Sequence, residues 1–329
     1  MSGLRIDALE YSKWNRDRFL EWRVGGLDTV HVTLATWETA RETLAVAGEW
    51  VRLLRDNDDL ITPVRNVRDI KFAKESGLTG VILGFQNTSP FEDDLDLING
   101  FYSAGVRIAQ LTYNIQNSVG SGCLEPSDSG LSGYFGKNLI QEMNRVGMLI
   151  DLSHCGDRTC LEAIQVSEKP LAITHANPYE YVGDNVALAK RNRSTEVIRE
   201  LVSAGGVIGL SMYPKLAPNG DNCTMEDFCR MVAWSAEKFG VDHLGIGTDL
   251  YLGHDIDSVI WWRTGRWGRV PIIPITGLPV FPDWMHSPAQ FTDLVTGLAA
   301  VGFASQEIDA VLGDNWFKLF ETVWVEEQQ

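Results

Sequence analysis

Two histidines occupy matching positions in successive segments of the sequence. His154 ends the apolar run LIDLSH and His175 ends the run LAITH, so each closes a predicted strand. If these strands are neighbours in a parallel sheet, their ends meet at one edge and both imidazoles can reach one ion. Neutral imidazole is the commonest protein ligand of zinc, and two His with an oxygen ligand and water make a catalytic site. A lone His would more often be a satisfied core residue, but a pair that ends successive strands predicts a metal site.

Two further charged residues could take part in the same chemistry. Asp249 ends the run HLGIGTD, where a carboxylate can ligate a metal or take a proton from attacking water. The alternative role for Asp249 is to cap a following helix. Arg191, in AKRNRS, could bind a substrate carboxylate through two hydrogen bonds, although most arginines in loops are solvated surface charges.

The elements that must position these residues alternate regularly along the chain. Amphipathic segments, such as 138–146, 158–166, 195–204 and 225–239, separate eight short apolar runs, and several of them end in glycine, the usual terminator of a helix. Eight strand-then-helix units favour a parallel (β/α)8 TIM barrel of the α/β class over a doubly wound sheet, and no GxGxxG follows the first strand. The predicted strands are Leu4–Leu9, Leu27–Ala35, Gly80–Phe85, Val106–Thr112, Met148–Ser153, Pro170–Thr174, Val207–Met212 and Leu244–Thr248.

Polar or metal-binding residue types stand at the carboxyl ends of all eight predicted strands. Chemistry in such barrels takes place at this end, where packing alone would favour Val, Ile or Leu. We expect one barrel domain over residues 1–329, a long loop at about 251–286 over the mouth, and two C-terminal helices within about 287–323. The strand-end residues are Tyr11, His31, Gln86, Tyr113, His154, His175, Ser211 and Asp249.

Composition excludes several classes of function. The 329 residues are 44% hydrophobic, which suits a globular protein with a large core, and their net charge of −16 disfavours nucleic acids and anionic membranes as partners. The sequence contains no apolar run long enough for a signal peptide or a membrane span. The five cysteines are odd in number and lack CxxC spacing, which indicates reduced thiols and a cytoplasmic location.

Segments between residues 79 and 250 resemble the membrane dipeptidase (renal dipeptidase, peptidase M19) family of the amidohydrolase superfamily. The resemblance implies a (β/α)8 barrel of the metallo-dependent hydrolase type that uses two zinc ions to hydrolyse dipeptides, often with a D-residue on the C-terminal side. The stretches that resemble the family are FYSAGVRIAQLTYN, NRVGMLIDLSHCGDRTCLEAI, EKPLAITHANP, KRNRSTEVIRELVSAGGVIGLSMYP and VDHLGIGTDL.

The resemblance implies a role for four residues that match the family pattern. His154 and His175 match two ligands of the second zinc. Asp249 matches the acidic residue that handles the catalytic proton, and Arg191 matches the arginine that recognises the substrate carboxylate. A small molecule with a carboxylate is therefore the expected substrate, and dimers are common among the relatives.

Four positions depart from the family pattern. The first-strand motif DGHxD reads DALEY here, so Leu9 and Tyr11 replace two ligands of the first zinc. The bridging glutamate becomes Gln86, and the histidine that helps to polarise the scissile carbonyl becomes Tyr113. Leucine does not ligate metals, and a neutral amide does not offset the charge of two cations. We therefore expect one zinc ion, or none, held by His154, His175 and an oxygen of Gln86 or Asp249.

Two of the strand-end residues have other possible roles. Tyr113 could donate a hydrogen bond to a developing oxyanion and contact the substrate. His31 shares the parity of Thr33 and could supply a ligand or an acid, although a buried structural histidine is the plainer interpretation.

Three functions are compatible with the sequence. The first is a mononuclear metallohydrolase that cleaves a dipeptide or another small amide. The second is an enzyme of altered chemistry, a non-peptide hydrolase, lyase or isomerase, because the Trp-rich segment at 251–286 offers aromatic walls for a planar or apolar substrate. The third is a non-catalytic protein that binds a small molecule.

Overall fold

Eight parallel strands form the frame of the structure, a computed structural model that describes residues 3–185, 188–275 and 277–324. Their order in the sheet is β1-β2-β4-β5-β6-β7-β8-β9. The ring closes where Tyr11 N donates to Leu250 O and Asp249 N donates to Leu9 O, at 2.8 and 3.0 Å. The predicted (β/α)8 barrel is therefore confirmed. The strands are β1 Ile6–Glu10, β2 Thr29–Ala35, β4 Thr79–Phe85, β5 Val106–Gln110, β6 Leu149–Asp151, β7 Ala172–Ile173, β8 Val207–Leu210 and β9 Leu244–Ile246.

A further short strand was not predicted. Strand β3 (Ile61–Pro63) pairs in parallel with the beginning of β4, outside the barrel path. Three residues that include a proline are too few to show a two-residue periodicity, so only the pairing partner reveals this strand.

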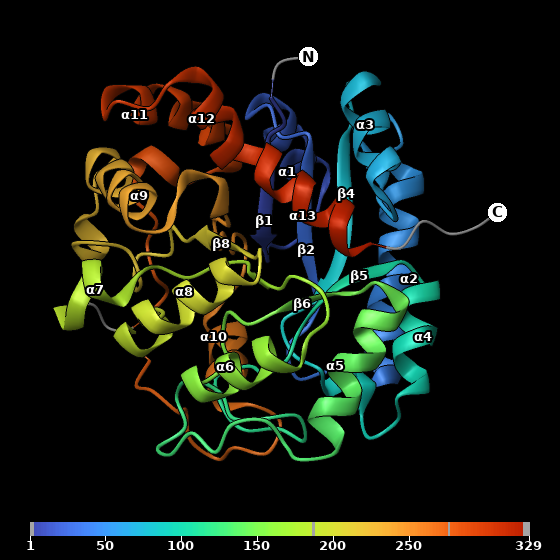
Figure 1. Cartoon of the computed structure of the whole chain (residues 1–329). Helices are drawn as coiled ribbons and strands as arrows, with labels where there is room; N and C mark the ends of the chain where they lie inside the picture. The colour runs from blue at the N-terminus through green and yellow to red at the C-terminus, as the bar shows by residue number, and fades with distance from the viewer. Residues whose placement is uncertain (1–2, 186–187, 276, 325–329) are drawn as a thin grey trace.

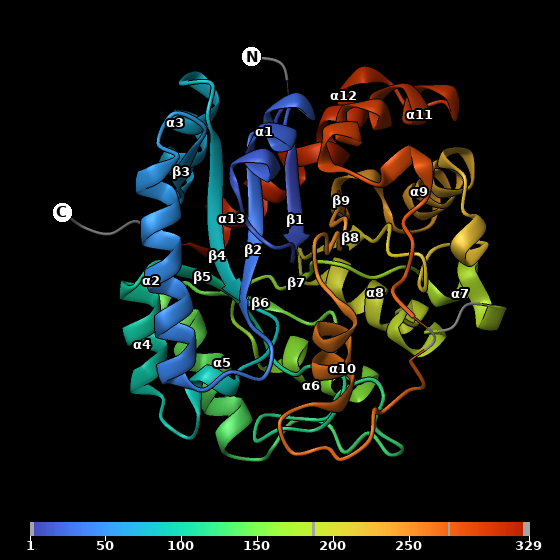
Figure 2. The same cartoon turned by 180° about the vertical axis from the view of Figure 1, so that it is seen from behind.

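Helices surround the barrel, as Figures 1 and 2 show from opposite sides. The predicted helix at 225–239 is observed with those bounds because Thr224 and Asp227 form a capping box at its start. Within the described residues, no helix combines the length and apolar character needed to cross a lipid bilayer. The helices that follow the strands, with one in the loop after β7, are α1 Arg16–Val24, α2 Ala40–Asp56, α3 Val67–Glu75, α4 Asp96–Ser103, α5 Phe135–Val146, α6 Asp157–Val166, α7 Tyr179–Val182, α8 Thr195–Ser203 and α9 Met225–Phe239.

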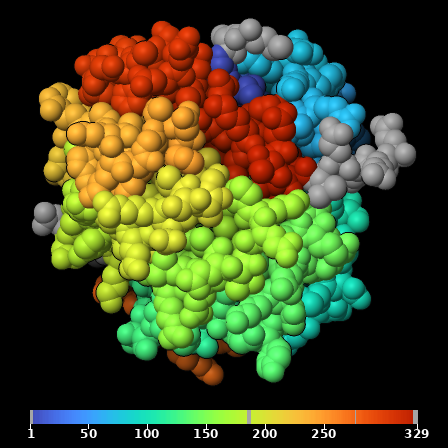
Figure 3. All heavy atoms as spheres, viewed as in Figure 1, coloured from blue at the N-terminus to red at the C-terminus, as the bar shows by residue number. Residues whose placement is uncertain are grey.

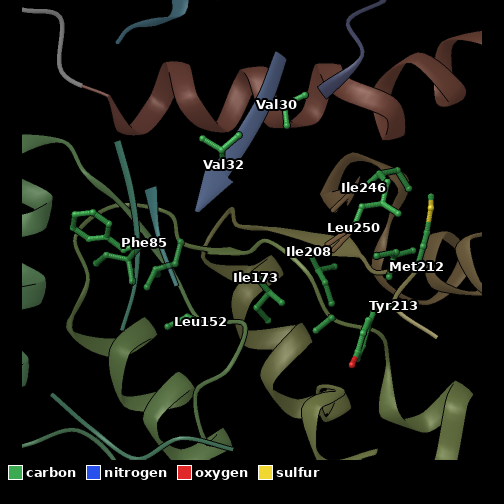
Figure 4. Packing of buried hydrophobic residues seen from close by; sticks show 14 of the residues in the cluster. Val30, Val32, Phe85, Leu152, Ile173, Ile208, Met212, Tyr213, Ile246 and Leu250 are labelled. Atoms are coloured by element: carbon green, nitrogen blue, oxygen red, sulfur yellow. The ribbon is translucent and has the colours of Figure 1, made fainter. Parts of the chain in front are cut away.

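Apolar side chains fill both faces of the barrel wall. Outward-facing residues of successive strands, such as Val32, Ile173 and Ile246, form one continuous core with the surrounding helices (Figure 4). Inward-facing residues near the amino ends of the strands pack instead against α13 (Asn315–Val323), whose Trp316 is fully buried. The C-terminal helix therefore closes the end of the barrel opposite the strand ends that carry the polar residues.

The segment predicted as a long loop at 251–286 contains a helix. Helix α10 (Ile256–Thr264) begins at Asp255, whose side chain accepts a hydrogen bond from Ser258 N. It lies beyond the carboxyl ends of the strands, below the tips of β1 and β2 in Figure 2. The loop prediction is wrong for these residues. It rested on the high Trp, Pro and Gly content of the whole segment, which does not reveal one short helix that begins at a capping Asp.

The two predicted C-terminal helices lie where expected but are segmented. A 3-10 turn, Pro288–Asp293, precedes α11 (Leu294–Ala300), and a π-helical segment, Ala310–Asp314, joins α12 (Ser305–Asp309) to α13. Gly313 permits this joint, because a Cβ there would lie 2.3 Å from the carbonyl oxygen of Leu4. In the space-filling view these segments, in red, extend from the region beside α9 to the centre of the face (Figure 3). The predicted domain also includes residues 1–2 and 325–329, which lie outside the described residues.

Gly209 on β8 is predicted to be essential for stability. A Cβ there would lie 2.0 Å from the carbonyl oxygen of Thr174, whereas a Cβ at Gly48 in α2 would meet no atom within 4 Å. We expect Gly209→Ala to lower the free energy of unfolding by about 1–3 kcal/mol or more, because it overpacks a rigid strand pair. The matched variant Gly48→Ala should raise that free energy by about 0.5–1 kcal/mol. Urea denaturation measures both, and equal effects of the two changes would contradict the prediction.

Candidate active site

His154 and His175 meet at the carboxyl ends of β6 and β7. Their Nε2 atoms lie 3.0 Å apart and both side chains are buried, at 6% and 0% exposure. The two histidines predicted from the sequence are thus brought together as a pair. What the pair can bind depends on which ring nitrogens carry protons.

A buried carboxylate fixes the protonation of His175. Asp151 accepts hydrogen bonds from the N–H and O–H groups of Ser153 and from those of Thr174, at 2.5–3.0 Å. Burial raises the pKa of Asp151 above its usual value, and these bonds oppose the shift. Because Thr174 gives its hydroxyl proton to Asp151, its Oγ1 must accept the 2.8 Å bond from His175 Nδ1–H. The Nε2 atom of His175 therefore has a free lone pair.

His154 has the same tautomer by a different route. Its Nδ1 lies 2.7 Å from the amide oxygen Oδ1 of Asn114, an acceptor, so Nδ1 bears the proton and Nε2 is bare. Tyr113 stacks on the His154 ring with centroids 4.2 Å apart, which fixes the ring plane. Asn114 reaches this position with a left-handed backbone (φ 64°), which asparagine tolerates better than most residues.

Two facing lone pairs 3.0 Å apart repel each other unless a cation lies between them. A shared proton is disfavoured, because burial and the positive charge of Arg191 lower the pKa of both imidazoles well below the usual value. Neutral imidazoles held by second hydrogen bonds are the form that binds zinc, so the pair fits a metal ion. Among the described residues, no set of three or more His, Cys, Asp or Glu side chains is grouped to hold an ion, so the pair supplies two ligands and a third must come from another group.

Asp249 follows β9 and lines the same cavity as His154. Its backbone is left-handed (φ 59°), and no described residue forms a hydrogen bond with its carboxylate. The preceding residue, Thr248, is anchored by two hydrogen bonds to the buried Asp7 carboxylate, at 2.5 and 2.9 Å. Burial raises the pKa of Asp249 to about 7, a shift that the charge of Arg191 opposes. The capping alternative does not hold, because Asp255 caps the next helix.

Arg191 is buried rather than solvated. It is 2% exposed, and its guanidinium donates hydrogen bonds to the backbone oxygens of Ser153 and His175, the latter at 3.2 Å. These bonds hold the cation against the loops that carry the two histidines. Arg191 therefore lines the cavity from a fixed position, which suits a group that binds an anion.

A cavity of about 50 Å³ is lined by His154, Asp249 and Arg191, whereas the fully buried His175 does not line it. Gln86 and Tyr113, two further residues predicted from the sequence, line it, and the amide of Gln86 donates to Thr33 Oγ1 at 3.0 Å. The wall is mainly aromatic and aliphatic. Asn114, which bonds to His154, also lines the cavity, and the remaining members are Tyr11, Leu124, Leu188, Tyr213, Tyr251, Val259, Trp262, Arg263 and Ile273.

His31 does not line this cavity. It is fully buried within the barrel, where Nδ1 bonds to Ala8 O at 2.6 Å and the ring occupies the space above Gly84. Burial lowers the pKa of His31 to about 4, so the ring is neutral. The interpretation of His31 as a buried structural histidine is therefore confirmed, whereas its alternative role as a ligand or acid at the mouth is not supported, because the β2 side chain at this depth points at the neighbouring strands.

Several residues of the site were missed in the sequence. Asn114 and Asp151 lie beside predicted residues, in QLTYN and LIDLSH, and their buried polar types were the available signal. Arg263 lies on α10, in a segment whose position periodicity does not give, so only the folded chain reveals that it reaches the cavity.

Comparison with known proteins agrees with the geometry. The sequence profile of the family described as "Membrane dipeptidase (Peptidase family M19)" matches residues 10–258. A dipeptidase of Schizosaccharomyces pombe, named as uncharacterized, is 24% identical over 89% of this chain and 62% of its own length. Dipeptidase aclJ of Aspergillus oryzae is 25% identical over 87% of this chain and 62% of its own length. The chain thus spans about three fifths of these curated relatives.

Solved structures extend the comparison. An amidohydrolase from Pseudomonas aeruginosa is 36% identical, has a TM-score of 0.92, and is matched over 98% of this chain and 97% of its own. A metallo peptidase from Rhodobacter sphaeroides, solved with a phosphinate mimic of the dipeptide L-Ala-D-Ala, has a TM-score of 0.80 at 16% identity, with 98% and 100% of the two chains covered. The second likeness shows the shared fold.

Proposed function

Because this chain belongs to the membrane dipeptidase family, peptidase family M19, we propose that it is a metal-dependent hydrolase that cleaves a dipeptide or another small amide. The observation that supports this most directly is the pair of bare Nε2 atoms, 3.0 Å apart, beside a cavity that contains a carboxylate and a buried arginine. We propose a mononuclear site, since Leu9 and Tyr11 replace the two ligands of the first metal.

The chain's own groups divide the reaction as follows. His154 and His175 would hold one zinc ion, with an oxygen of Gln86 or Asp249 as a further ligand, and the ion would supply Lewis-acid catalysis when bound. Arg191 orients the substrate through its carboxylate, and Tyr113 donates a hydrogen bond to the oxyanion that develops on the carbonyl. Asp249 accepts a proton from the attacking water and returns it to the leaving amine. The aromatic wall excludes bulk water.

Two measurements on the purified protein test this proposal. Protein prepared without chelators is analysed for metal content, and a library of dipeptides and simple amides is screened with and without added zinc. We expect close to one zinc per chain and turnover of at least one amide. A metal content near zero, together with no turnover after zinc is added, would contradict the hydrolase proposal.

The aromatic wall supports a second candidate, an enzyme of altered chemistry. Trp262 packs against Tyr11 and Tyr251, with ring centroids 5.1 and 5.6 Å apart, so a planar or apolar substrate would find matched surfaces. The same screen discriminates, because robust turnover of ordinary dipeptides rules this candidate out. Tight binding of a small molecule without any product would favour a non-catalytic protein.

The proposed role of Asp249 predicts a pH dependence. With a pKa of about 7, the carboxylate is protonated at lower pH and then has no capacity to accept a proton. We expect kcat/KM to fall as the pH drops below about 7, approaching a tenfold loss per pH unit. The rate is measured from pH 5 to 9 at constant ionic strength. A rate that stays flat between pH 5 and 8 would remove Asp249 from this role.

We also propose a cellular compartment, a type of partner and an oligomeric state for this protein. All five cysteines are free thiols, and four of them are buried, which suits a reducing compartment such as the cytoplasm. We propose a small carboxylate-bearing molecule as partner, and a homodimer as the assembly, with neither nucleic acid nor membrane involved. Size-exclusion chromatography with light scattering tests the assembly.

A further inference from the structure

The cavity beside the two histidines is positively charged. Among the described residues that line it, the charged side chains are two arginines, Arg191 and Arg263, and one carboxylate, Asp249. The chain as a whole has a net charge of −16, so this local excess of positive charge runs against the composition. A pocket of this kind attracts anions and repels cations.

Arg263 differs from the cations around it. Nearby Arg266 pairs with Glu42 at 2.8 Å, and Lys215, which lines an adjoining cavity, pairs with Asp221 at 2.6 Å. Arg263 is half-buried, donates to the hydroxyl of Tyr213 at 3.1 Å, and forms no ion pair with any carboxylate in the described part of the chain. An unpaired, partly desolvated guanidinium is costly unless it serves to bind an anion.

Arg263 also lies where two cavities meet. The adjoining cavity of about 210 Å³ shares Arg263, Leu188, Val259 and Ile273 with the cavity at the histidines. A ligand that reaches from Arg191 to Arg263 would therefore have room for its remaining atoms.

We infer that Arg263, with the Tyr213 hydroxyl, binds a second anionic group of the substrate. This inference rests on the proposed function and specifies its substrate class: a small amide with two carboxylates and no free ammonium group, such as an acylated acidic amino acid. The first carboxylate lies on Arg191, as in the proposed reaction, and the second on Arg263. A free ammonium group on the substrate is disfavoured in this cavity. Asp249 is the only carboxylate among the described lining residues, and the two guanidinium groups of the lining would repel the ammonium.

Three ligands of equal chain length test the subsite directly. Pentanoate, glutarate and 5-aminopentanoate each have five carbons and one terminal carboxylate, and they differ at the other end, which is a methyl, a carboxylate or an aminomethyl group. Isothermal titration of the full chain, as purified, measures the affinity for each ligand. We expect glutarate to bind about tenfold or more tighter than pentanoate, since a charged hydrogen-bonded pair adds this much, and 5-aminopentanoate to bind weakest.

Variants of two arginines on the same segment isolate the cause. Arg263→Met should lower the affinity for glutarate about tenfold or more and leave that for pentanoate unchanged, because only the second carboxylate loses its partner. Arg263→Lys should retain part of the preference. The matched control Arg266→Met removes a cation outside the cavity and should change neither affinity. Thermal unfolding of each variant verifies that the fold is retained.

The outcomes separate this inference from the proposed function. If 5-aminopentanoate binds as tightly as glutarate, or if Arg263→Met leaves glutarate affinity unchanged in a folded protein, the subsite is overturned even when dipeptides are hydrolysed. If the glutarate preference depends on Arg263 but no amide is turned over with zinc present, the subsite stands and the hydrolase proposal fails.

Discussion

Replacement of His175 by glutamine is expected to weaken zinc binding by more than 100-fold and, as a result, to abolish amide hydrolysis. The two Nε2 lone pairs are the only pair of imidazole nitrogens that the described residues bring this close, at 3.0 Å, and one of them disappears in the variant. Loss of a partner that merely orients a ligand already costs about 10–100-fold in metal affinity, so loss of the ligand itself should exceed 100-fold. Zinc titration of metal-stripped protein measures this without any substrate.

Two further variants bracket the His175 result. His286 is exposed and outside the cavity, so His286→Gln should leave zinc affinity unchanged. Thr174→Val removes the acceptor that fixes His175 Nδ1–H, so it should weaken zinc binding by about 10–100-fold while retaining the ligand. If His175→Gln bound zinc as well as the unaltered protein, the pair would not be the metal site.

Replacement of Asp249 by asparagine is expected to lower kcat by about 10²–10⁴-fold, the range that a general acid or base contributes. The amide keeps the size of the side chain, but it has no charge and does not accept a proton near neutral pH. The loss of rate below about pH 7 should vanish together with most of the activity, because both come from one group.

Controls for Asp249 distinguish a base from a ligand. If the carboxylate acts as a base, Asp249→Asn should retain zinc. A variant that loses both zinc and activity would instead make Asp249 the third ligand. Asp257 lies on the exposed side of α10, outside the cavity, so Asp257→Asn should leave kcat unchanged. Activity of Asp249→Asn within tenfold of the unaltered protein would contradict both roles.

The barrel was predictable because its information is local. Each predicted strand is a short apolar run between amphipathic segments, and all eight are observed, with ends that shift by a few residues. The ends of helices were also predictable from the sequence. Gly147 ends α5 with a left-handed backbone (φ 84°, ψ 27°), the conformation that a glycine after a helix predicts. Two short elements were not predicted. Strand β3 depends on its pairing partner β4, and helix α10 depends on the single cap at Asp255, so neither shows a repeated sequence pattern.

The candidate site was only partly predictable. The strand-end rule identified His154, His175 and Asp249, since the carboxyl ends of parallel strands lie at one edge of a barrel. It also put His31 among the strand-end residues, although the structure confirms the plainer interpretation of a buried structural histidine; parity gives the face of a strand but not the depth within the barrel. The rule did not identify the hydrogen-bond partners, such as Asn114 and Asp151, that determine which ring nitrogens of the two histidines are free.

The amino-acid sequence by itself determined the barrel, the family and the two imidazoles, because alternation of strands and helices and the residue at each strand end are properties of short segments. Only the tertiary structure decided the tautomers of the imidazoles, the burial of Arg191 and the approach of Arg263. Those properties depend on closure of the ring, which brings chain segments more than a hundred residues apart to one end of the barrel and removes water from between them. The protein partners that replace this water determine which imidazole nitrogens donate hydrogen bonds and which charged side chains face the cavity.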